Sequence, residues 1–201
     1  MSVLISYIDL LPSVDVEAGE VFCGLTDSPL STAGLRGLKK AVRRRDDWQA
    51  VITSPRSCCT VFAEWLARKH DIPAQTNEAF AEMNFGEWEG QLPCSIMIND
   101  STTIGRWWRD PAAVTPPNGE SFNDFQQRVL AGWQQLIKTY RGQTVLLVTH
   151  PGVVRMLLSE VLHMPSYAFF SLQIENGYLS RIRVIHDDSG DWANVMQHGC
   201  Q

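Results

Sequence analysis

The 201-residue chain lacks the features that mark several classes of protein. It has no excess of basic residues, with 17 lysines and arginines against 22 aspartates and glutamates, so its charge does not favour nucleic acid or an anionic membrane as a partner. The apolar stretch at residues 1–11 is too short to span a membrane, and no basic region precedes it as in a targeting segment. We therefore expect a cytoplasmic protein.

The sequence also lacks a cysteine pairing pattern. Its five cysteines are odd in number and include no Cys-x-x-Cys spacing; they are Cys23, Cys58, Cys59, Cys94 and Cys200. This pattern favours a reducing compartment. Adjacent cysteines rarely form a disulfide without strain, so we interpret Cys58 and Cys59 as small core residues at the start of a helix.

What is present is the composition of an ordinary globular protein. Hydrophobic residues make up 44% of the chain and charged residues 19%, and we find no internal repeat or low-complexity tract. The length suits one domain over residues 1–201, with a core large enough to need neither a metal nor a disulfide.

The clearest local pattern surrounds His150. Thr144–Val148 is a short apolar run, typical of a strand buried on both faces, and Pro151-Gly152 ends it. Apolar residues then recur at helical spacing, and a proline suits the first position of a helix. His150 therefore lies at the carboxyl end of a strand, where open α/β sheets bind ligands beside a helix N-terminus that favours anions. A buried structural histidine is the alternative, but this location favours a functional site.

The same strand–turn–helix pattern occurs twice earlier in the chain. Val3–Leu11 and Gln49–Thr53 are predicted strands. A helix capped by Ser31 follows the first strand after a loop, and a helix from Ser54-Pro55 to about Lys69 follows the second. The alternation predicts an α/β fold with a mostly parallel central sheet and helices on both of its faces.

The second half of the chain is less regular. Residues 91–118 form a long irregular insertion, either a lid or binding loop or a helical insertion. Asn176-Gly177 is a strong hairpin signal between Leu172–Glu175 and Tyr178–Ile185. The tail over residues 187–201 has little pattern, and we expect it to be loose.

Five motifs occur in a characteristic order along the chain. They are Phe22-Cys-Gly-Leu-Thr-Asp-Ser-Pro-Leu-Ser31, Ser54-Pro55, Glu82-Met-Asn-Phe-Gly-Glu-Trp-Glu-Gly90, Pro117-x-Gly-Glu-Ser121 and Val148-Thr-His150. Together they resemble the histidine phosphatase superfamily, above all the small bacterial phosphatases that include α-ribazole phosphatase. The resemblance implies a phosphoglycerate-mutase-like fold and phosphoryl transfer through a phosphohistidine. It also implies two arginines and a second histidine that hold the phosphate, and a glutamate that serves as acid and base.

The resemblance breaks at the residues that carry this chemistry. Family members often read Asp-Leu-Leu-Arg-His-Gly-Glu where this chain reads Asp9-Leu-Leu-Pro-Ser-Val-Asp15. Pro12 therefore stands at the first arginine and Ser13 at the nucleophilic histidine. The second arginine is expected three residues after Pro55, where this chain has Cys58. Glu82 and His150 match the acid/base glutamate and the second histidine.

These departures predict that phosphoryl transfer is lost or strongly impaired. The hydroxyl of Ser13 is a poor nucleophile without a base, and each lost charge-stabilising group removes about 2–4 kcal/mol from the transition state. We expect a pseudophosphatase that acts as a binding or interaction protein, with a small phosphorylated ligand or another protein as its partner. The alternative is an active phosphomonoesterase that acts on a small phosphorylated metabolite through Ser13 or an activated water. Arg56 would replace the second arginine only if its helix begins late.

We expect five residues to contact a ligand. Cys23, Gly24 and Thr26 belong to the first motif, and Trp107 and Trp108 lie in the insertion. The two tryptophans either line a lid or simply pack the insertion.

We predict no metal and no other cofactor. A metal site built from Ser13, Cys58, Glu82 and His150 would lack a second histidine or a paired thiol.

Overall fold

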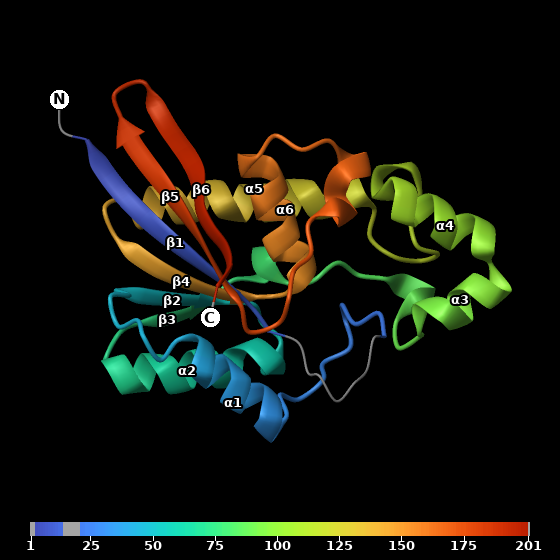
Figure 1. The fold of residues 1–201 in the computed structure, drawn as a ribbon, viewed down its shortest axis with the longest axis horizontal. Helices are drawn as coiled ribbons and strands as arrows, with labels where there is room; N and C mark the ends of the chain where they lie inside the picture. Colours follow the sequence, from blue (N-terminus) through green and yellow to red (C-terminus); the bar gives the residue numbers. More distant parts are fainter. Residues whose placement is uncertain (1–2, 14–20, 201) are drawn as a thin grey trace.

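Six strands form one sheet in the order β3-β2-β4-β1-β5-β6 in a computed structural model that describes residues 3–13 and 21–200 (Figure 1). In chain order the strands are β1 (Leu4–Pro12), β2 (Ala50–Thr53), β3 (Ala74–Thr76), β4 (Thr144–Thr149), β5 (Leu179–Asp187) and β6 (Gly190–Cys200). Strands β3, β2, β4 and β1 run parallel to one another. Strand β5 runs antiparallel to β1, and β6 runs antiparallel to β5. The predicted mostly parallel sheet is confirmed.

Helices cover both faces of this sheet, because successive side chains of a strand point to opposite sides. Leu146 and Val148 of β4 share an apolar cluster with α1 (Thr32–Ala41) and α2 (Ser57–His70). Val145 and Leu147 share the other cluster with α5 (Phe122–Thr139) and α6 (Pro151–Val161). Figure 1 shows α1 and α2 together on one side of the sheet, and α5 and α6 on the other.

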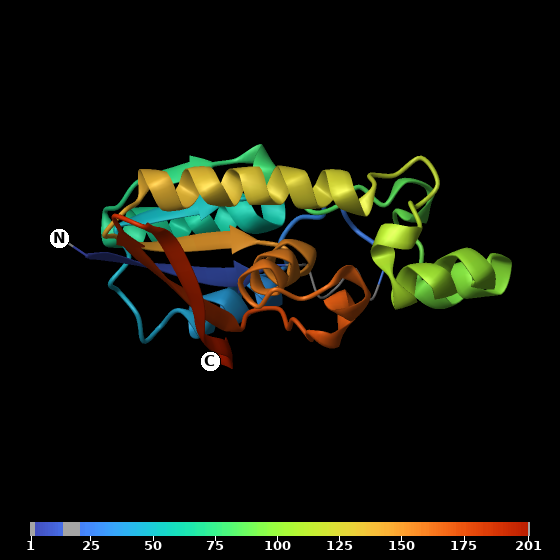
Figure 2. The same ribbon diagram turned by 90° about the horizontal axis from the view of Figure 1, so that it is seen from above.

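The insertion at residues 91–118 is helical. It contains α3 (Pro93–Asn99), α4 (Ser101–Arg109) and the 3-10 turn η4 (Pro111–Ala113). Figures 1 and 2 show α3 and α4 projecting from the end of the sheet at which the parallel strands terminate. Ile96, Ile104 and Trp107 are buried in the main core, so of the two alternatives the packed helical insertion is correct.

The expected hairpin at Asn176-Gly177 is wrong. Gly177 does turn the chain, with a φ of 74°, but Leu172–Glu175 is not a strand. The hairpin joins β5 to β6 instead, through a turn in which the Asp187 carboxylate accepts hydrogen bonds from the backbone N–H groups of Ser189 at 2.7 Å and Gly190 at 3.1 Å.

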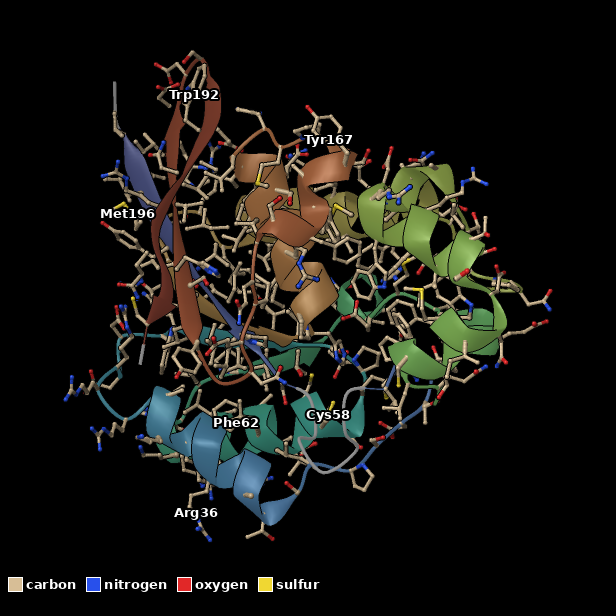
Figure 3. All side chains as sticks on the ribbon, turned by 45° about the vertical axis from the view of Figure 1, so that its right-hand side comes forward. Arg36, Cys58, Phe62, Tyr167, Trp192 and Met196 are labelled. Carbon is tan, nitrogen blue, oxygen red and sulfur yellow. The ribbon has the colours of Figure 1, made fainter. Side chains whose placement is uncertain are left out.

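The expected loose tail is wrong as well, because residues 190–200 form the edge strand β6. This strand exposes much of both faces and carries polar residues, so it lacks the apolar alternation that makes a strand visible in sequence. Figure 3 shows Trp192 and Met196 of β6 at the surface.

Outside the insertion, the described residues also contain the 3-10 turns η2 (Glu78–Phe80), η3 (Gly86–Trp88) and η5 (Ser166–Ser171). The expected cap at Ser31 is confirmed, since its side chain accepts a hydrogen bond from the Gly34 N–H at 3.0 Å. No helix within residues 3–13 and 21–200 is both long and apolar enough to cross a membrane.

Candidate functional site

The carboxyl ends of three parallel strands bring polar side chains together at one edge of the sheet. Ser13 follows β1, Ser54 follows β2 and His150 follows β4, and all three are buried. Cys58 and Cys59 reach the same place from the first turn of α2, where Figure 3 labels Cys58. Because parallel strands end at the same edge, residues far apart in the sequence meet here.

Ser13 is held in place by two short hydrogen bonds. Its backbone N–H donates to the Thr149 carbonyl and its hydroxyl donates to the Cys58 carbonyl, each at 2.7 Å. A carbonyl oxygen cannot accept a proton as a base does, so this hydroxyl is not activated as a nucleophile. Val14 and Asp15, which complete the family frame, lie outside the described residues.

His150 is a neutral imidazole in this site. Its Nε2 lies 2.7 Å from the Ser54 hydroxyl and 3.8 Å from the Cys59 sulfur. Burial, together with the positive charges of Arg56 and Arg128, lowers the pKa of His150 to about 3. At neutral pH it therefore adds no positive charge with which to hold a phosphate.

Glu82 lies at the N-terminus of α6. Its carboxylate accepts hydrogen bonds from the backbone N–H groups of Met83 at 2.9 Å and Gly152 at 2.8 Å. Burial nevertheless raises the pKa of Glu82 above its ordinary value. A side chain at position 152 would meet the Glu82 carboxyl carbon at 2.8 Å, so this close approach requires glycine.

Helix α2 begins later than the sequence predicted. It starts at Ser57, and Arg56 is its extended N-cap residue, so the condition under which Arg56 could serve the site is met. The Ser54 hydroxyl lies 2.7 Å from Nε2 of His150, and the Asp27 carboxylate accepts from the Ser57 N–H at 2.7 Å, so residues distant in the sequence contact the start of this helix. The Arg56 charge acts on His150, and its buried Nε has no hydrogen-bond partner among the described residues.

An aromatic cleft of about 530 Å³ opens beside these groups. Cys23, Trp107 and Trp108 line it, and their contact with a ligand stays a prediction; Glu82 and Arg155 supply its charged groups. Its other aromatic lining residues are Phe22, Phe85, Phe125, Phe169 and Phe170. Several of these rings contact one another edge to face; the ring centroids of Trp107 and Trp108, for example, lie 4.9 Å apart. The aromatic side chains that line the cleft are therefore packed against one another.

Gly24 and Thr26 are not among the residues that line this cleft. Their N–H groups donate to the Glu89 carboxylate, Gly24 at 3.0 Å and Thr26 at 3.3 Å. These hydrogen bonds lower the pKa of Glu89 although its burial acts in the opposite direction. The two residues therefore shape the loop that carries Cys23, and their contact with a ligand stays a prediction.

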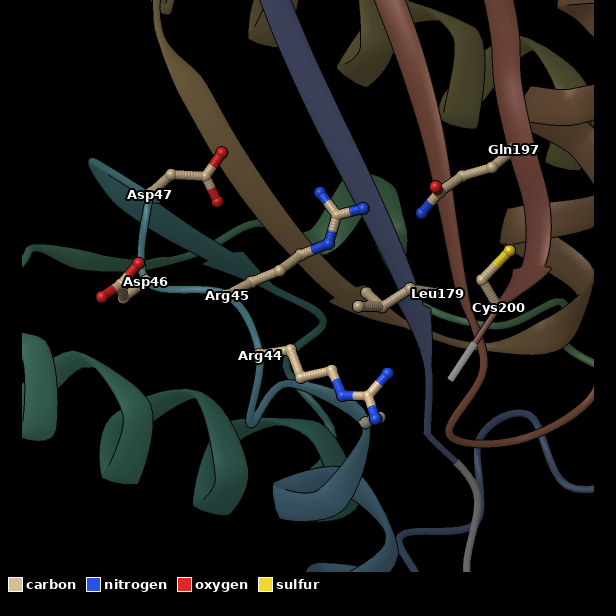
Figure 4. A pocket seen from close by; sticks show the side chains of 8 residues that line it. Arg44, Arg45, Asp46, Asp47, Leu179, Gln197 and Cys200 are labelled. Atoms are coloured by element: carbon tan, nitrogen blue, oxygen red, sulfur yellow. The ribbon is translucent and has the colours of Figure 1, made fainter.

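A second pocket of about 470 Å³ contains none of the predicted residues (Figure 4). Two of its four charged side chains form ion pairs with residues outside the pocket, since Arg45 lies 3.7 Å from Asp9 and Asp47 lies 3.2 Å from Arg181. The aromatic cleft with its neighbouring polar cluster is therefore the better candidate site.

Sequence reasoning did not assign three residues that the structure brings into this region. Ser54 was identified only as part of a motif, and Cys59 only as a core residue, yet both contact His150. Arg155 was not identified at all, although it follows His150 by little more than one helical turn; its Nε donates to the Leu172 carbonyl at 2.9 Å.

Comparison with curated proteins finds relatives that differ in length. A bifunctional protein of Mycobacterium tuberculosis is 30% identical over 181 residues, which cover 89% of this chain and 50% of that protein. This chain thus spans about half the length of the mycobacterial relative. The adenosylcobalamin/alpha-ribazole phosphatase of Escherichia coli is 25% identical over 166 residues, 82% of each chain.

Comparison with solved structures confirms the fold. The structure of Bacillus stearothermophilus YhfR matches with a TM-score of 0.87 and 25% identity over 98% of both chains. The family model described as the histidine phosphatase superfamily (branch 1) matches residues 13–194. With most of its length matched in this way, the chain belongs to the histidine phosphatase superfamily.

Proposed function

We propose that this chain is a pseudophosphatase, which binds a ligand in the aromatic cleft without transferring its phosphoryl group. The observation that carries the proposal is the state of Ser13, the residue at the nucleophile's position. Its buried hydroxyl donates a hydrogen bond to the Cys58 carbonyl at 2.7 Å. Among the residues that the structure describes, no imidazole or carboxylate accepts its proton. A serine in this arrangement lacks the base that a nucleophilic hydroxyl needs.

The charges around the site support the same proposal. A phosphoryl dianion needs several cationic or N–H donors around its oxygens, and bidentate arginine contacts are the strongest of these. Here Pro12 and Cys58 occupy the two positions that the family resemblance assigns to arginine, and His150 is neutral. Arg155 faces the cleft but binds the Leu172 carbonyl and lies against the rings of Phe169 and Phe170.

The ligand we propose is a small phosphorylated molecule with an apolar or aromatic portion. The aromatic lining of the cleft would contact the apolar portion, while Arg155 and Arg56 would attract the anionic group. The E. coli relative is an adenosylcobalamin/alpha-ribazole phosphatase by name, and this supports a small phosphorylated ligand. A protein partner is the second outcome that a binding test would distinguish.

An active phosphomonoesterase is the rival function, and one observation favours it. The late start of α2 leaves the buried Nε of Arg56 without a partner in the described part of the chain, so this side chain has a donor available for a phosphate. Glu82, whose pKa is raised, would then serve as the acid.

Phosphate release from p-nitrophenyl phosphate separates the two functions. We expect the purified chain to release no more phosphate than its Glu82→Ala and His150→Ala variants. Glu64→Ala, which removes an exposed carboxylate on α2, is the matched control. Activity that survives purification, disappears in both site variants and persists in Glu64→Ala would contradict the proposal.

A back-substitution tests whether the family frame is placed correctly. The variant combines Pro12→Arg, Ser13→His, Val14→Gly and Cys58→Arg. Each restored arginine adds charge-assisted hydrogen bonds of about 1.5–3 kcal/mol, so two of them should tighten phosphate binding by about 10²–10⁴-fold. Isothermal titration with inorganic phosphate measures this. An unchanged affinity in a folded variant would show that the first loop is aligned wrongly.

A further inference from the structure

Two thiols and one imidazole converge at the buried end of α2, independently of the proposed function. The sulfur atoms of Cys58 and Cys59 lie 3.9 Å apart, and the Cys59 sulfur lies 3.8 Å from Nε2 of His150. All three atoms lie within 4.8 Å of one another. The sulfur–sulfur distance is far longer than a disulfide bond of about 2.05 Å.

These distances are close to those of a tetrahedral zinc site. With Zn–S bonds of about 2.3 Å and a Zn–N bond of about 2.0 Å, tetrahedral angles separate two sulfurs by about 3.8 Å and a sulfur from a nitrogen by about 3.5 Å. The sulfur–sulfur distance of 3.9 Å and the sulfur–nitrogen distance of 3.8 Å therefore lie within about 0.3 Å of these values. We propose that Cys58, Cys59 and His150 form a binding site for a thiophilic divalent d¹⁰ cation, with Zn²⁺ as the ion that fits best.

The charge of this ligand set suits its burial. Two thiolates and a neutral imidazole cancel the charge of Zn²⁺, so the complete site would place no net charge in the core. Binding breaks the two S–H bonds and forms two S–Zn bonds, and the two protons leave to solvent. Both cysteines lie in the first turn of α2, where the positive end of the helix dipole favours an anion. Burial nevertheless raises the pKa of the Cys59 thiol well above its ordinary value, so its proton would leave as the metal binds.

A fourth ligand is available within the same cluster. The Ser54 hydroxyl is 2.7 Å from Nε2 of His150, and the hydroxyls of Ser13 and Ser54 both interact with the Cys59 thiol. Coordination through Nε2 would exchange the hydrogen bond to Ser54 for a bond to the metal. The freed hydroxyl oxygen would then face the ion and could complete four-coordination.

The prediction that no metal binds rested on a different set of residues. It combined Ser13, Cys58, Glu82 and His150 and assigned Cys59 to the core. In the structure the Glu82 carboxylate turns to the N–H groups of Met83 and Gly152, whereas Cys59 reaches His150.

The test uses the full chain without an affinity tag, reduced and stripped with a chelator. Equilibrium dialysis against Zn²⁺ should give one zinc per chain. Cys59→Ser and His150→Gln should each weaken binding at least about 100-fold, since losing even an outer partner of a metal ligand costs about 10–100-fold. The matched control is the double variant Cys94→Ser/Cys200→Ser, which removes two exposed thiols and should bind as the unmodified chain does.

A cobalt spectrum keeps the test decisive if the site variants do not fold. Co²⁺ bound to the double control variant should show thiolate-to-metal charge-transfer absorption and the strong visible bands of a four-coordinate ion. The weak visible bands of six-coordinate cobalt, or no binding, would overturn the proposal. Zinc binding that persists in Cys59→Ser, or that is lost in the double control variant, would overturn it too.

Discussion

Replacing Gly152 by alanine would test whether the close approach of α6 fixes the Glu82 carboxylate. The new methyl group would meet the carboxyl carbon of Glu82 at 2.8 Å, so the carboxylate must turn away and lose the 2.8 Å hydrogen bond from the residue 152 N–H. A hydrogen bond to a charged group is worth about 1.5–3 kcal/mol. Alanine is favoured over glycine in a helix by up to about 1 kcal/mol, so we expect a net loss of about 0.5–2 kcal/mol.

A double-mutant cycle by urea unfolding at pH 7 separates these two contributions. In a Glu82→Ala background the overlap with residue 152 is gone, and Gly152→Ala should then be neutral or stabilising by up to about 1 kcal/mol. An equal loss of stability in both backgrounds would refute the reasoning, because the effect would then have another origin.

The pH dependence of the same variant provides a second check. The pKa of Glu82 is raised in the folded chain, so the folded chain holds this proton more tightly than the unfolded chain does. Protonation of Glu82 therefore contributes to the free energy of unfolding. That contribution is complete below the unfolded pKa and is lost as pH rises through the folded pKa. Removing an N–H donor from the carboxylate raises that pKa further. The deficit of Gly152→Ala should therefore shrink in acid, where the carboxyl group is neutral in both chains.

Three other predictions concern histidine protonation, a buried ion pair and a helix cap. Burial lowers the pKa of His150 to about 3, so its NMR signals should not titrate near pH 6.5. For the same reason, the free energy of unfolding should fall as pH drops from about 6.5 toward 3. A titration of His150 near pH 6.5 would contradict its burial. Arg181→Ala removes the 2.7 Å ion pair of the fully buried Asp9 carboxylate but leaves it the Trp48 N–H at 2.8 Å and Arg45 at 3.7 Å. Urea unfolding should therefore show a loss of about 1.5–3 kcal/mol, and a loss below about 0.5 kcal/mol would argue against the pairing. Ser31→Ala should cost about 1 kcal/mol by thermal unfolding, whereas Ser31→Asn, which also caps, should cost little.

The parts of the fold that sequence predicted are those fixed by local patterns. His150 was placed at the end of a buried strand because an apolar run, a proline and a helical pattern follow one another within a few residues. The start of α2 was misplaced because it depends on partners far away in the sequence, namely Asp27 at the Ser57 N–H and His150 at the Ser54 hydroxyl. Such a cap cannot be seen in the local pattern around Ser54-Pro55.

In the candidate site, too, the sequence predicts what local patterns determine and misses what contacts between distant residues determine. Glu82 was found only through the family resemblance, because a carboxylate in an irregular loop carries no local signal of burial. The two tryptophans of α4 were identified by composition, but their packing beside Phe170 depends on how η5 folds back over the insertion. Cys59 was assigned to the core correctly as regards burial, but its distance to His150 follows from sheet order, which residue periodicity does not encode.

The central place of β1 has a consequence for how the protein forms. In the sequence, β1 (Leu4–Pro12) lies far from both of its neighbours in the sheet, β4 (Thr144–Thr149) and β5 (Leu179–Asp187). The Ser6 hydroxyl forms a hydrogen bond with Nε2 of His186 across 180 residues. The apolar side chains of Ile8, Leu10 and Leu11 can therefore be buried only after these distant segments have been synthesised and have folded onto β1. Contacts of such long sequence separation slow folding, so the nascent chain should depend on chaperones that shield its first strand.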